Sequence, residues 1–513
     1  MSIPGHAENE ATRQFALNFE APYPSNAFRT LGRTELTVSK LGFGTYRCHQ
    51  NNQIHFEGLK RAIEKGCNVI DTSSNYSDGF SESLIGDVLN SKIVWGKLRR
   101  QELVVISKVG YIQGENLSLA LKLEEENRPF PEVVKYGEGI WHCIHPYFIS
   151  DQITRTLSRM HIDELDIYLL HNPEYYLLDC QKKRIHHKTA QEEFYRRIHN
   201  AFIQLEKLVD RKLIRFYGIS SNTFPVESSQ YDFVSLARIW EEYQRVCSEL
   251  EMSTNEGHFA AIQFPFNWLE HRAYTLKNNL FQSEKWTVLD LAMKLNLGVV
   301  VNRPLNSLAN NKMYRLARYG ADETTDYSIV FNEELTRLGE LENSLQEIIQ
   351  NHNANIKINN NVDLKSVFQN IETLQKIRLQ SPDISGISNL VDYYFLPLFK
   401  IGEKTLLSKM KANREKAKAA IEGYLRQFNR VALSIRNQAD KLNYLDLKPL
   451  EERFNHANRT LADKLSFSQK AIQAISEVDG IHVVLNGMRT PAYVDDAMAT
   501  MSVEAIEIKG LFR

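Results

Sequence analysis

Eight short apolar segments, each followed by a segment with helical spacing, limit what this 513-residue chain can fold into. The first is 41–44 and the last is 481–485. The six between them are 67–70, 102–108, 165–171, 214–220, 259–264 and 297–301. Strands that alternate with helices pair in parallel through right-handed crossovers, and eight such units close a (β/α)8 barrel, or TIM barrel. The sequence therefore predicts an α/β fold of this kind.

An open, doubly wound sheet is the alternative architecture. That fold binds nucleotides through a Gly-x-Gly-x-x-Gly turn after its first strand. Here Gly42-Phe43-Gly44 is followed by Thr-Tyr-Arg, so the turn is missing and the barrel is favoured.

Two long stretches interrupt the alternation of strands and helices. Residues 111–145 are polar and contain Pro129-Phe130-Pro131, so we expect a long insertion there rather than a regular element. Residues 310–460 form a mainly helical insertion between strand 7 and helix 7. We therefore predict a barrel formed by 28–308 and 466–513, a helical insertion at 310–460 on the C-terminal face of the barrel, and an N-terminal extension at 1–27.

The segment 409–428 inside the helical insertion is predicted to be one long basic helix. A basic helix can bind nucleic acid or a protein partner. Glu415 and Glu422 interrupt the charge, and the net charge of the whole chain is −1, so a solvated helix face is favoured and no nucleic-acid partner is expected. We expect the insertion to be a lid or a contact surface for a protein partner rather than an independent catalytic domain.

Composition points to a soluble cytoplasmic protein. The chain is 43% hydrophobic and 24% charged, and no apolar run is long enough to cross a bilayer, so no membrane partner is expected. Residues 1–18 lack the apolar core of a secretory signal. The five cysteines form no Cys-x-x-Cys pair, and the Trp-His-Cys-Ile-His-Pro segment that begins at Trp141 has no second ligand pair, so no metal site is predicted.

Residues that can transfer protons stand where three predicted strands end. Asp71, Lys108 and His171 close strands two, three and four, and Tyr76 follows Asp71 by five residues. Each alone has an ordinary explanation, such as turn chemistry around Asp71 or a core histidine. Active sites of such barrels lie at the C-terminal ends of the strands, so the coincidence of all four favours a catalytic site.

These four side chains suit the reduction of a carbonyl group or its reverse. An unperturbed phenol titrates near 10, and a neighbouring lysine ammonium is expected to lower that pKa. An aspartate holds the lysine in place, and a neutral histidine can bond to the substrate oxygen. Because no side chain supplies a hydride, a cofactor must do so.

Seven segments, which together run from about residue 28 to 308 and from 466 to 503, resemble the aldo-keto reductases in the order of that family. They are Leu31-Gly-Arg-Thr-Glu-Leu-Thr-Val-Ser-Lys-Leu-Gly-Phe-Gly-Thr45; Asp71-Thr-Ser-x-x-Tyr76 with Glu82 and Gly86; Ser107-Lys108; Asp166-Ile-Tyr-Leu-Leu-His171; Gly218-Ile-Ser-Ser-Asn222; Ile262-Gln263; and Val484-Leu-x-Gly-Met-Arg489. The resemblance implies a TIM barrel that binds NADP(H). It implies Tyr76 as general acid/base, Asp71 and Lys108 as the groups that tune it, and His171 as part of the oxyanion-binding pocket.

The same resemblance implies which residues hold the nicotinamide. Thr45, Tyr46 and Asp71 would line the ring. Gln263 would hold the carboxamide together with Ser220, Ser221 or Asn222, and the doubled serine leaves that pairing ambiguous by one position. The loop Asn302-Arg303-Pro304-Leu305 stands where many members carry an aromatic residue that stacks on the nicotinamide, and Asn302 cannot stack as a ring does.

At the adenosine end, Gly487-Met488-Arg489-Thr490 lies where the family binds the 2′-phosphate, and Arg489 is the obvious cation there. Asp495 and Asp496 stand where the family often has an acid and then an amide that contact adenine. NADP is therefore the expected cofactor, with NAD as the alternative.

The resemblance implies an NADP-dependent oxidoreductase that transfers a hydride between nicotinamide and a carbonyl or alcohol carbon of an aldehyde, ketone or sugar. The alternative is a non-catalytic or weakly catalytic nicotinamide-sensing module, as the potassium-channel β-subunits of this family partly are. In that case the 310–460 insertion would bind a protein partner.

Overall fold

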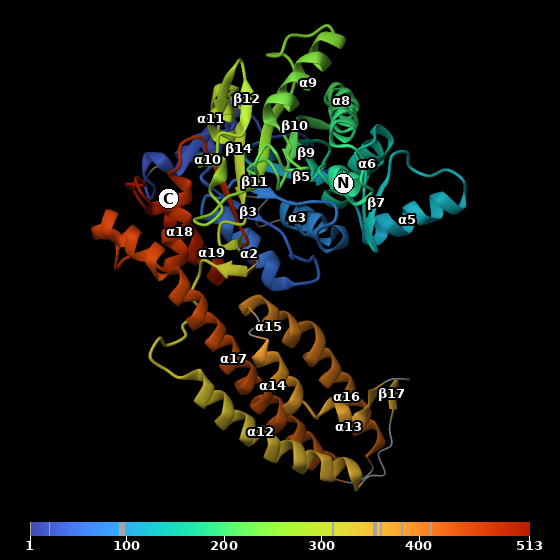
Figure 1. Cartoon of the computed structure of the whole chain (residues 1–513), viewed down its shortest axis with the longest axis vertical. Helices are drawn as coiled ribbons and strands as arrows, with labels where there is room; N and C mark the ends of the chain where they lie inside the picture. The colour runs from blue at the N-terminus through green and yellow to red at the C-terminus, as the bar shows by residue number, and fades with distance from the viewer. Residues whose placement is uncertain are drawn as a thin grey trace. The chain divides into compact units, whose positions relative to one another are not determined.

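A computed structural model describes residues 2–19, 21–91, 98–309, 312–351, 357–359, 362–380, 383–410 and 413–512. The chain divides into two compact units (Figure 1). One consists of Met1–Ser307 with Arg453–Arg513, and the other of Leu308–Glu452.

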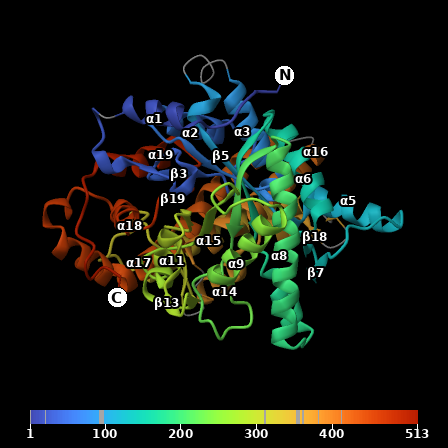
Figure 2. The same ribbon diagram turned by 90° about the horizontal axis from the view of Figure 1, so that it is seen from above.

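The first unit is built on a closed barrel of eight parallel strands (Figure 2). In order around the barrel they are β3 (Leu41–Gly44), β4 (Val69–Asp71), β5 (Val104–Val109), β9 (Leu165–His171), β10 (Ile214–Ser220), β11 (Phe259–Pro265), β14 (Gly298–Asn302) and β19 (Val483–Asn486). Each barrel strand overlaps one of the eight predicted segments. The predicted (β/α)8 fold is therefore confirmed.

Amphipathic helices follow the strands around the barrel. They are α2 (Gln53–Glu64), α3 (Phe80–Asn90), α6 (Pro146–Met160), α8 (His187–Asp210), α9 (Leu236–Glu249), α11 (Val288–Lys294), α18 (Phe467–Ser476) and α19 (Pro491–Met498). Several of these helices begin with a capping residue: Thr287 accepts a hydrogen bond from the Asp290 amide, and Ser466 forms a capping box with Gln469. Such caps satisfy amides that have no partner inside the helix.

A hairpin closes the N-terminal end of the barrel. Its strands are β1 (Phe28–Thr30) and β2 (Thr37–Ser39), which pair antiparallel. Leu31, Leu36 and Val38 are almost fully buried and belong to one core cluster with inward-facing residues of the barrel. Leu31 lies against Gly298, the first residue of β14. This apolar plug leaves the opposite end, where the strands finish, for polar side chains.

The prediction that residues 111–145 contain no regular element is wrong. They hold β6 (Tyr111–Ile112), α5 (Gly114–Glu125), β7 (Val134–Gly137) and β8 (Ile140–His142), and the strands form a small sheet in the order β6, β8, β7. Strands of two to four residues are too short to show a two-residue alternation. The pairing of β7 with β8 also shifts register between Lys135 and Gly137, which breaks any pattern.

The remaining elements of the first unit are short. They are α1 (Asn9–Leu17), α7 (Tyr175–Lys182), α10 (Arg272–Thr275), β12 (Asn279–Phe281) and β13 (Glu284–Trp286).

The second unit is mainly helical, which agrees with the predicted helical insertion between strand 7 and helix 7. Its helices are α12 (Tyr327–Gln350), α13 (Leu364–Val367), α14 (Ile371–Leu379), α15 (Ile384–Leu390), α16 (Leu396–Lys409) and α17 (Arg414–Ala457), the last of which continues into the first unit. Its short strands are β16 (Lys312–Arg315), β17 (Lys357–Asn359) and β18 (Val362–Asp363), and β15 (Asn306–Ala309) precedes β16. Phe331, Leu338, Phe399 and Phe428 belong to a core cluster formed within this unit.

The predicted continuous helix over 409–428 is wrong. Helix α16 ends at Lys409 and α17 begins at Arg414. Asn413 has a φ of 60°, which belongs to the left-handed region and cannot continue a right-handed helix. Lys411, which the prediction included, lies outside the described residues.

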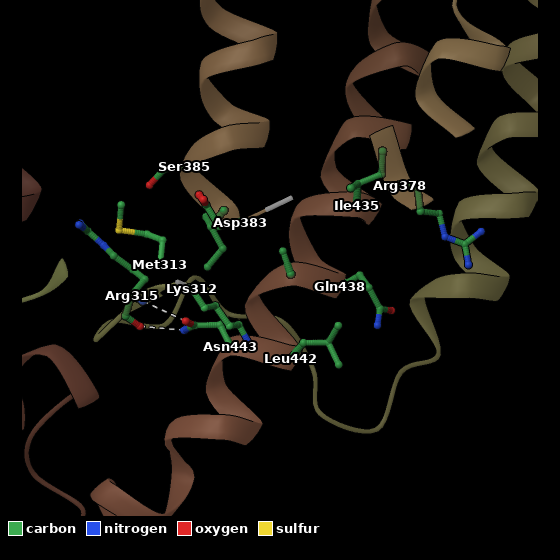
Figure 3. A pocket seen from close by; sticks show the side chains of 12 residues that line it. Lys312, Met313, Arg315, Arg378, Asp383, Ser385, Ile435, Gln438, Leu442 and Asn443 are labelled. Atoms are coloured by element: carbon green, nitrogen blue, oxygen red, sulfur yellow. Dashed lines mark hydrogen bonds between the residues drawn. The ribbon is translucent and has the colours of Figure 1, made fainter. Parts of the chain in front are cut away.

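A cavity of about 390 Å³ lies within the second unit, between β16, α14, α15 and α17 (Figure 3). Its wall combines apolar side chains such as Ile435 and Leu442 with charges of both signs, among them Arg378 and Asp383. The amide of Asn443 holds β16 on α17, because it accepts from the Arg315 N–H at 2.9 Å and donates to the Arg315 carbonyl at 2.8 Å.

No helix in the described ranges is both long and apolar enough to span a lipid bilayer.

Candidate active site

The four predicted catalytic side chains meet at the C-terminal end of the barrel. Asp71 and His171 are the last residues of β4 and β9, and Lys108 is the last but one of β5. Tyr76 begins a short 3-10 helix that follows β4. In the strand register Asp71 lies beside Ile106, and Lys108 lies beside Leu169. Three adjacent strands therefore present their end residues to one region.

A buried ion pair forms the centre of the site. Lys108 Nζ donates to Asp71 Oδ1 at 2.6 Å and to the Thr72 carbonyl at 2.7 Å. Gln263 Nε2 donates to the other carboxylate oxygen of Asp71 at 2.9 Å. The lysine is 0% exposed and the aspartate 3%. Burial raises the pKa of Asp71 and lowers the pKa of Lys108, while each partner's charge opposes the shift of the other.

Tyr76 places its phenol ring above this pair. Lys108 Nζ lies 5.0 Å from the ring centroid, and the rings of Tyr46 and His171 lie at 5.2 and 5.9 Å. Burial raises the pKa of Tyr76 well above 10, and the charge of Asp71 acts in the same direction. The prediction that Lys108 lowers this pKa is therefore wrong for this structure. Asp71 balances the lysine charge at 2.6 Å, so the pair exerts little net positive field on the phenol.

His171 is held as a neutral ring. Its Nδ1 lies 3.0 Å from Ser73 Oγ, and that hydroxyl donates to Asn75 Oδ1 at 2.7 Å. Burial lowers the pKa of His171 well below 6.5, and the charge of Lys108 adds to the shift. Because that hydroxyl gives its proton to Asn75, it accepts from the Nδ1–H of the neutral ring, which fixes the rotation of the imidazole and leaves Nε2 as a hydrogen-bond acceptor.

Three aromatic residues near His171 were missed by sequence reasoning. Tyr111 of β6 meets the His171 ring edge-on at 4.8 Å, and Tyr175 of α7 meets Tyr111 at 5.3 Å. His142 of β8 stacks on Tyr175 at 5.7 Å and bonds through Nε2 to the His171 carbonyl at 2.7 Å. The sequence signal was the density of His and Tyr in 111–147, but their spacing alone does not point to His171.

His142 is not part of a metal cluster in this structure. Burial lowers its pKa to about 4, so the ring is neutral. Among the described residues, no group of three or more His, Cys, Asp or Glu is arranged to hold a metal ion.

A hydrogen-bond network continues from Asp71 to three further strands, with Gln263 of β11 at its centre. Ser220 of β10 and Asn302 of β14 both donate to Gln263 Oε1, each at 3.2 Å. In the strand register Ser220 lies beside both His171 and Gln263. The chain of hydrogen bonds therefore runs from Asn302 through Gln263 and Asp71 to Lys108.

The other two candidates for the carboxamide face elsewhere. The Ser221 hydroxyl accepts from the Thr223 amide at 3.1 Å, in the loop after β10. Asn222 is exposed, and its backbone N–H donates to Glu174 at 2.8 Å. Of the three residues that the sequence left open, Ser220 is the one whose side chain bonds to the Gln263 side chain, whereas Ser221 donates its backbone N–H to the Gln263 carbonyl at 2.9 Å.

Buried polar atoms test whether the strand ends fit a nicotinamide. Thr45 Oγ1, Thr72 Oγ1 and Asn302 Oδ1 are buried and have no hydrogen-bond partner within the described residues. An unmet buried polar atom costs free energy, and a bound polar group can supply the missing partner. Thr45 follows β3, Thr72 follows β4, and Asn302 is the last residue of β14. These unmet atoms suit a bound polar group such as the amide of a nicotinamide.

The loop after β14 is fixed by its own contacts. Arg303 adopts a φ of 55° and donates to Glu270 at 3.0 Å. Leu305 is buried at 7% exposure, and Pro304 lies between them.

The predicted adenosine-binding residues lie in the loop after β19 and on α19. Met488 is buried, Gly487 is exposed, and Arg489 is half-exposed with its backbone against Gly58 of α2. Two acidic side chains on α19 make contacts within the protein. Asp495 pairs with Arg61 at 2.7 Å, whereas Asp496 accepts from Ser468 at 2.9 Å.

A family model described as the aldo/keto reductase family matches residues 40–358. An NADH-specific methylglyoxal reductase of Escherichia coli strain K12 is 28% identical over 149 residues, which is 28% of this chain and 40% of that protein. A 6-dehydroglucose reductase of Novosphingobium aromaticivorans is 24% identical over 164 residues, 30% of this chain and 44% of that one.

Among solved structures, a glycerol dehydrogenase of Gluconobacter oxydans is 15% identical, with a TM-score of 0.44 over 93% of this chain and 90% of that one. The chain spans less than half the length of the curated relatives named above.

Replacing Asp71 by asparagine would leave the Lys108 ammonium buried without its counter-charge. We expect Asp71→Asn to lower the free energy of unfolding by about 3–5 kcal/mol, measured by urea denaturation at pH 7. The double variant Asp71→Asn/Lys108→Met should recover most of that loss, because no charge then remains buried. A double variant as unstable as the single one would show that the ion pair is not the cause.

Proposed function

The chain belongs to the aldo/keto reductase family, and from this membership we propose that it is an NADP-dependent oxidoreductase. It would transfer a hydride between the nicotinamide and the carbonyl or alcohol carbon of an aldehyde, a ketone or a sugar. The observation that carries the proposal is the buried Lys108–Asp71 pair. The Lys108 ammonium lies 5.0 Å from the Tyr76 ring centroid, and β5, which carries Lys108, pairs with β9, which ends at His171. NAD is the alternative cofactor.

When bound, the nicotinamide supplies or accepts the hydride. Tyr76 gives its hydroxyl proton to the substrate oxygen during reduction, and its raised pKa keeps that proton in place beforehand. The neutral ring of His171, 5.9 Å from the Tyr76 ring, lies beside the substrate and limits the orientation of its carbonyl. The phenolate left on Tyr76 has its ring centroid 5.0 Å from the Lys108 ammonium, and Asp71 keeps that ammonium in position.

The preference for NADP rests on Arg489. The chain offers a half-exposed guanidinium in the loop after β19, where the family binds the 2′-phosphate. A guanidinium binds phosphate through paired, charge-assisted hydrogen bonds. Arg61 is also nearby in the fold, on α2, but Asp495 already neutralises its charge through bonds of 2.7 and 2.8 Å.

Removing the Tyr76 hydroxyl should abolish proton transfer but not cofactor binding. We expect Tyr76→Phe to lower the turnover rate by about 10²–10⁴-fold, with the dissociation constant for NADPH nearly unchanged. Steady-state rates and a fluorescence titration measure the two quantities. Tyr147→Phe, which alters an exposed phenol on α6, is the matched control and should behave like the wild type. Normal turnover by Tyr76→Phe would exclude the mechanism.

The raised pKa of Tyr76 predicts opposite pH dependences for the two directions of the reaction. Reduction needs the protonated phenol, which persists up to at least about pH 10, so its rate should be flat from about pH 6 to 9. Oxidation needs the phenolate and should become faster as the pH rises through the same range. Turnover numbers in both directions test this. A reduction rate that falls tenfold per pH unit above pH 7 would mean that the pKa is lowered instead.

Arg489→Ala should weaken NADPH binding far more than NADH binding. Loss of a charge-assisted hydrogen bond to the 2′-phosphate should raise the NADPH dissociation constant by roughly 10- to 100-fold. Arg61→Ala, which removes a guanidinium already paired with Asp495, should change both affinities equally. Equal losses for the two nucleotides in Arg489→Ala would remove the assignment of this residue to the phosphate.

A further inference from the structure

Asn302 holds an unused hydrogen-bond acceptor at the mouth of the barrel. Its Nδ2 donates to Gln263 Oε1 at 3.2 Å, whereas its Oδ1 is buried and has no partner among the residues that the structure describes. Rotating the Asn302 amide by 180° would not supply the missing partner, because Nδ2 would then face away from Gln263 Oε1 and lose its own hydrogen bond. The bond to Gln263 thus determines that Oδ1, rather than Nδ2, is the atom of the Asn302 amide without a partner.

Gln263, the family's expected carboxamide partner, has little acceptor capacity left in this chain. Its Oε1 accepts from both Ser220 and Asn302, each at 3.2 Å, and a carbonyl oxygen has two lone pairs. Its Nε2 donates to Asp71 at 2.9 Å and cannot accept. A ligand that arrives with N–H donors therefore finds Gln263 occupied and Asn302 Oδ1 free.

The position of Asn302 suits a group attached next to the reacting carbon of the cofactor. One residue, Gln263, separates Asn302 from Asp71, and Asp71 bonds directly to Lys108 under the Tyr76 ring. The nicotinamide must present its C4 carbon to a substrate that lies beside Tyr76 and His171. Its carboxamide is attached to the neighbouring ring carbon and carries the N–H2 donor of the ring.

We propose that Asn302 Oδ1 accepts a hydrogen bond from the carboxamide N–H2 of the bound nicotinamide, so that Asn302 selects for that amide. The inference rests on the proposed function and deepens it. A stacking ring at this position would contact the face of any pyridine. Asn302 Oδ1 is instead a hydrogen-bond acceptor. It therefore recognises the carboxamide, because that substituent carries an N–H donor.

An analogue of the cofactor isolates this hydrogen bond. In the 3-acetylpyridine analogue of NADP the carbonyl remains, but a methyl group replaces the N–H2. We would titrate NADP and this analogue against the full-length chain by intrinsic fluorescence and compare their dissociation constants. The wild type should prefer NADP by about three- to tenfold, as expected for one hydrogen bond.

Asn302→Leu should abolish that preference, because leucine has a similar volume and no acceptor. Asn302→Ala repeats the test if the leucine variant does not fold. Asn90→Leu, which makes the same substitution at the exposed end of α3, is the matched control, so the preference should remain. The ratio of the two affinities, rather than either alone, separates recognition from a general loosening of the site.

Three results would overturn the inference alone: no preference in the wild type, an unchanged preference in the Asn302 variants, or an equal loss of preference in Asn90→Leu. A wild type that binds neither nucleotide would instead refute the proposed function and this inference together.

Discussion

The Lys108–Asp71 ion pair is the interaction on which the rest of this structure depends. An ammonium with no exposure to water is tolerated only when its charge and its protons are matched, since the cost of desolvating it is several kcal/mol. The partners come from separate parts of the barrel: Asp71 ends β4, the Thr72 carbonyl follows it, and Gln263 lies on β11. The pair is thus complete only in the closed barrel, so folding and the assembly of the site are one event.

The fold could be predicted from sequence because buried parallel strands are short apolar runs, and eight of them are separated by helical segments. Asp71, Lys108 and His171 could be predicted because the ends of parallel strands converge. Tyr111 and His142 could not, since they come from strands too short to show a pattern and reach His171 only through tertiary packing. The direction of the Tyr76 pKa also depends on burial and on the balance of two opposite charges, neither of which a sequence displays.

The hydrogen-bond network explains why an asparagine is compatible with the end of β14. Asn302 is linked through Gln263 to Asp71, so β14 and β11 support the same carboxylate that positions Lys108. A phenyl ring at this position could not donate to Gln263. The chain therefore exchanges an apolar contact for a polar one that extends into the catalytic centre. The geometry of Lys108 becomes sensitive to a residue that lies three strands from β4 around the barrel.

The helical unit also affects how the protein is made. It separates Asn302, the end of β14, from Val483, the start of β19, although these two strands are neighbours in the barrel. A ribosome that adds about 5–20 residues per second therefore takes about ten to forty seconds to synthesise the segment between them. During that time seven strands are available without the eighth, and β14 and β3 have unpaired edges. The nascent chain is exposed to mispairing for this whole interval, and a chaperone that covers strand edges would be of most use to it then.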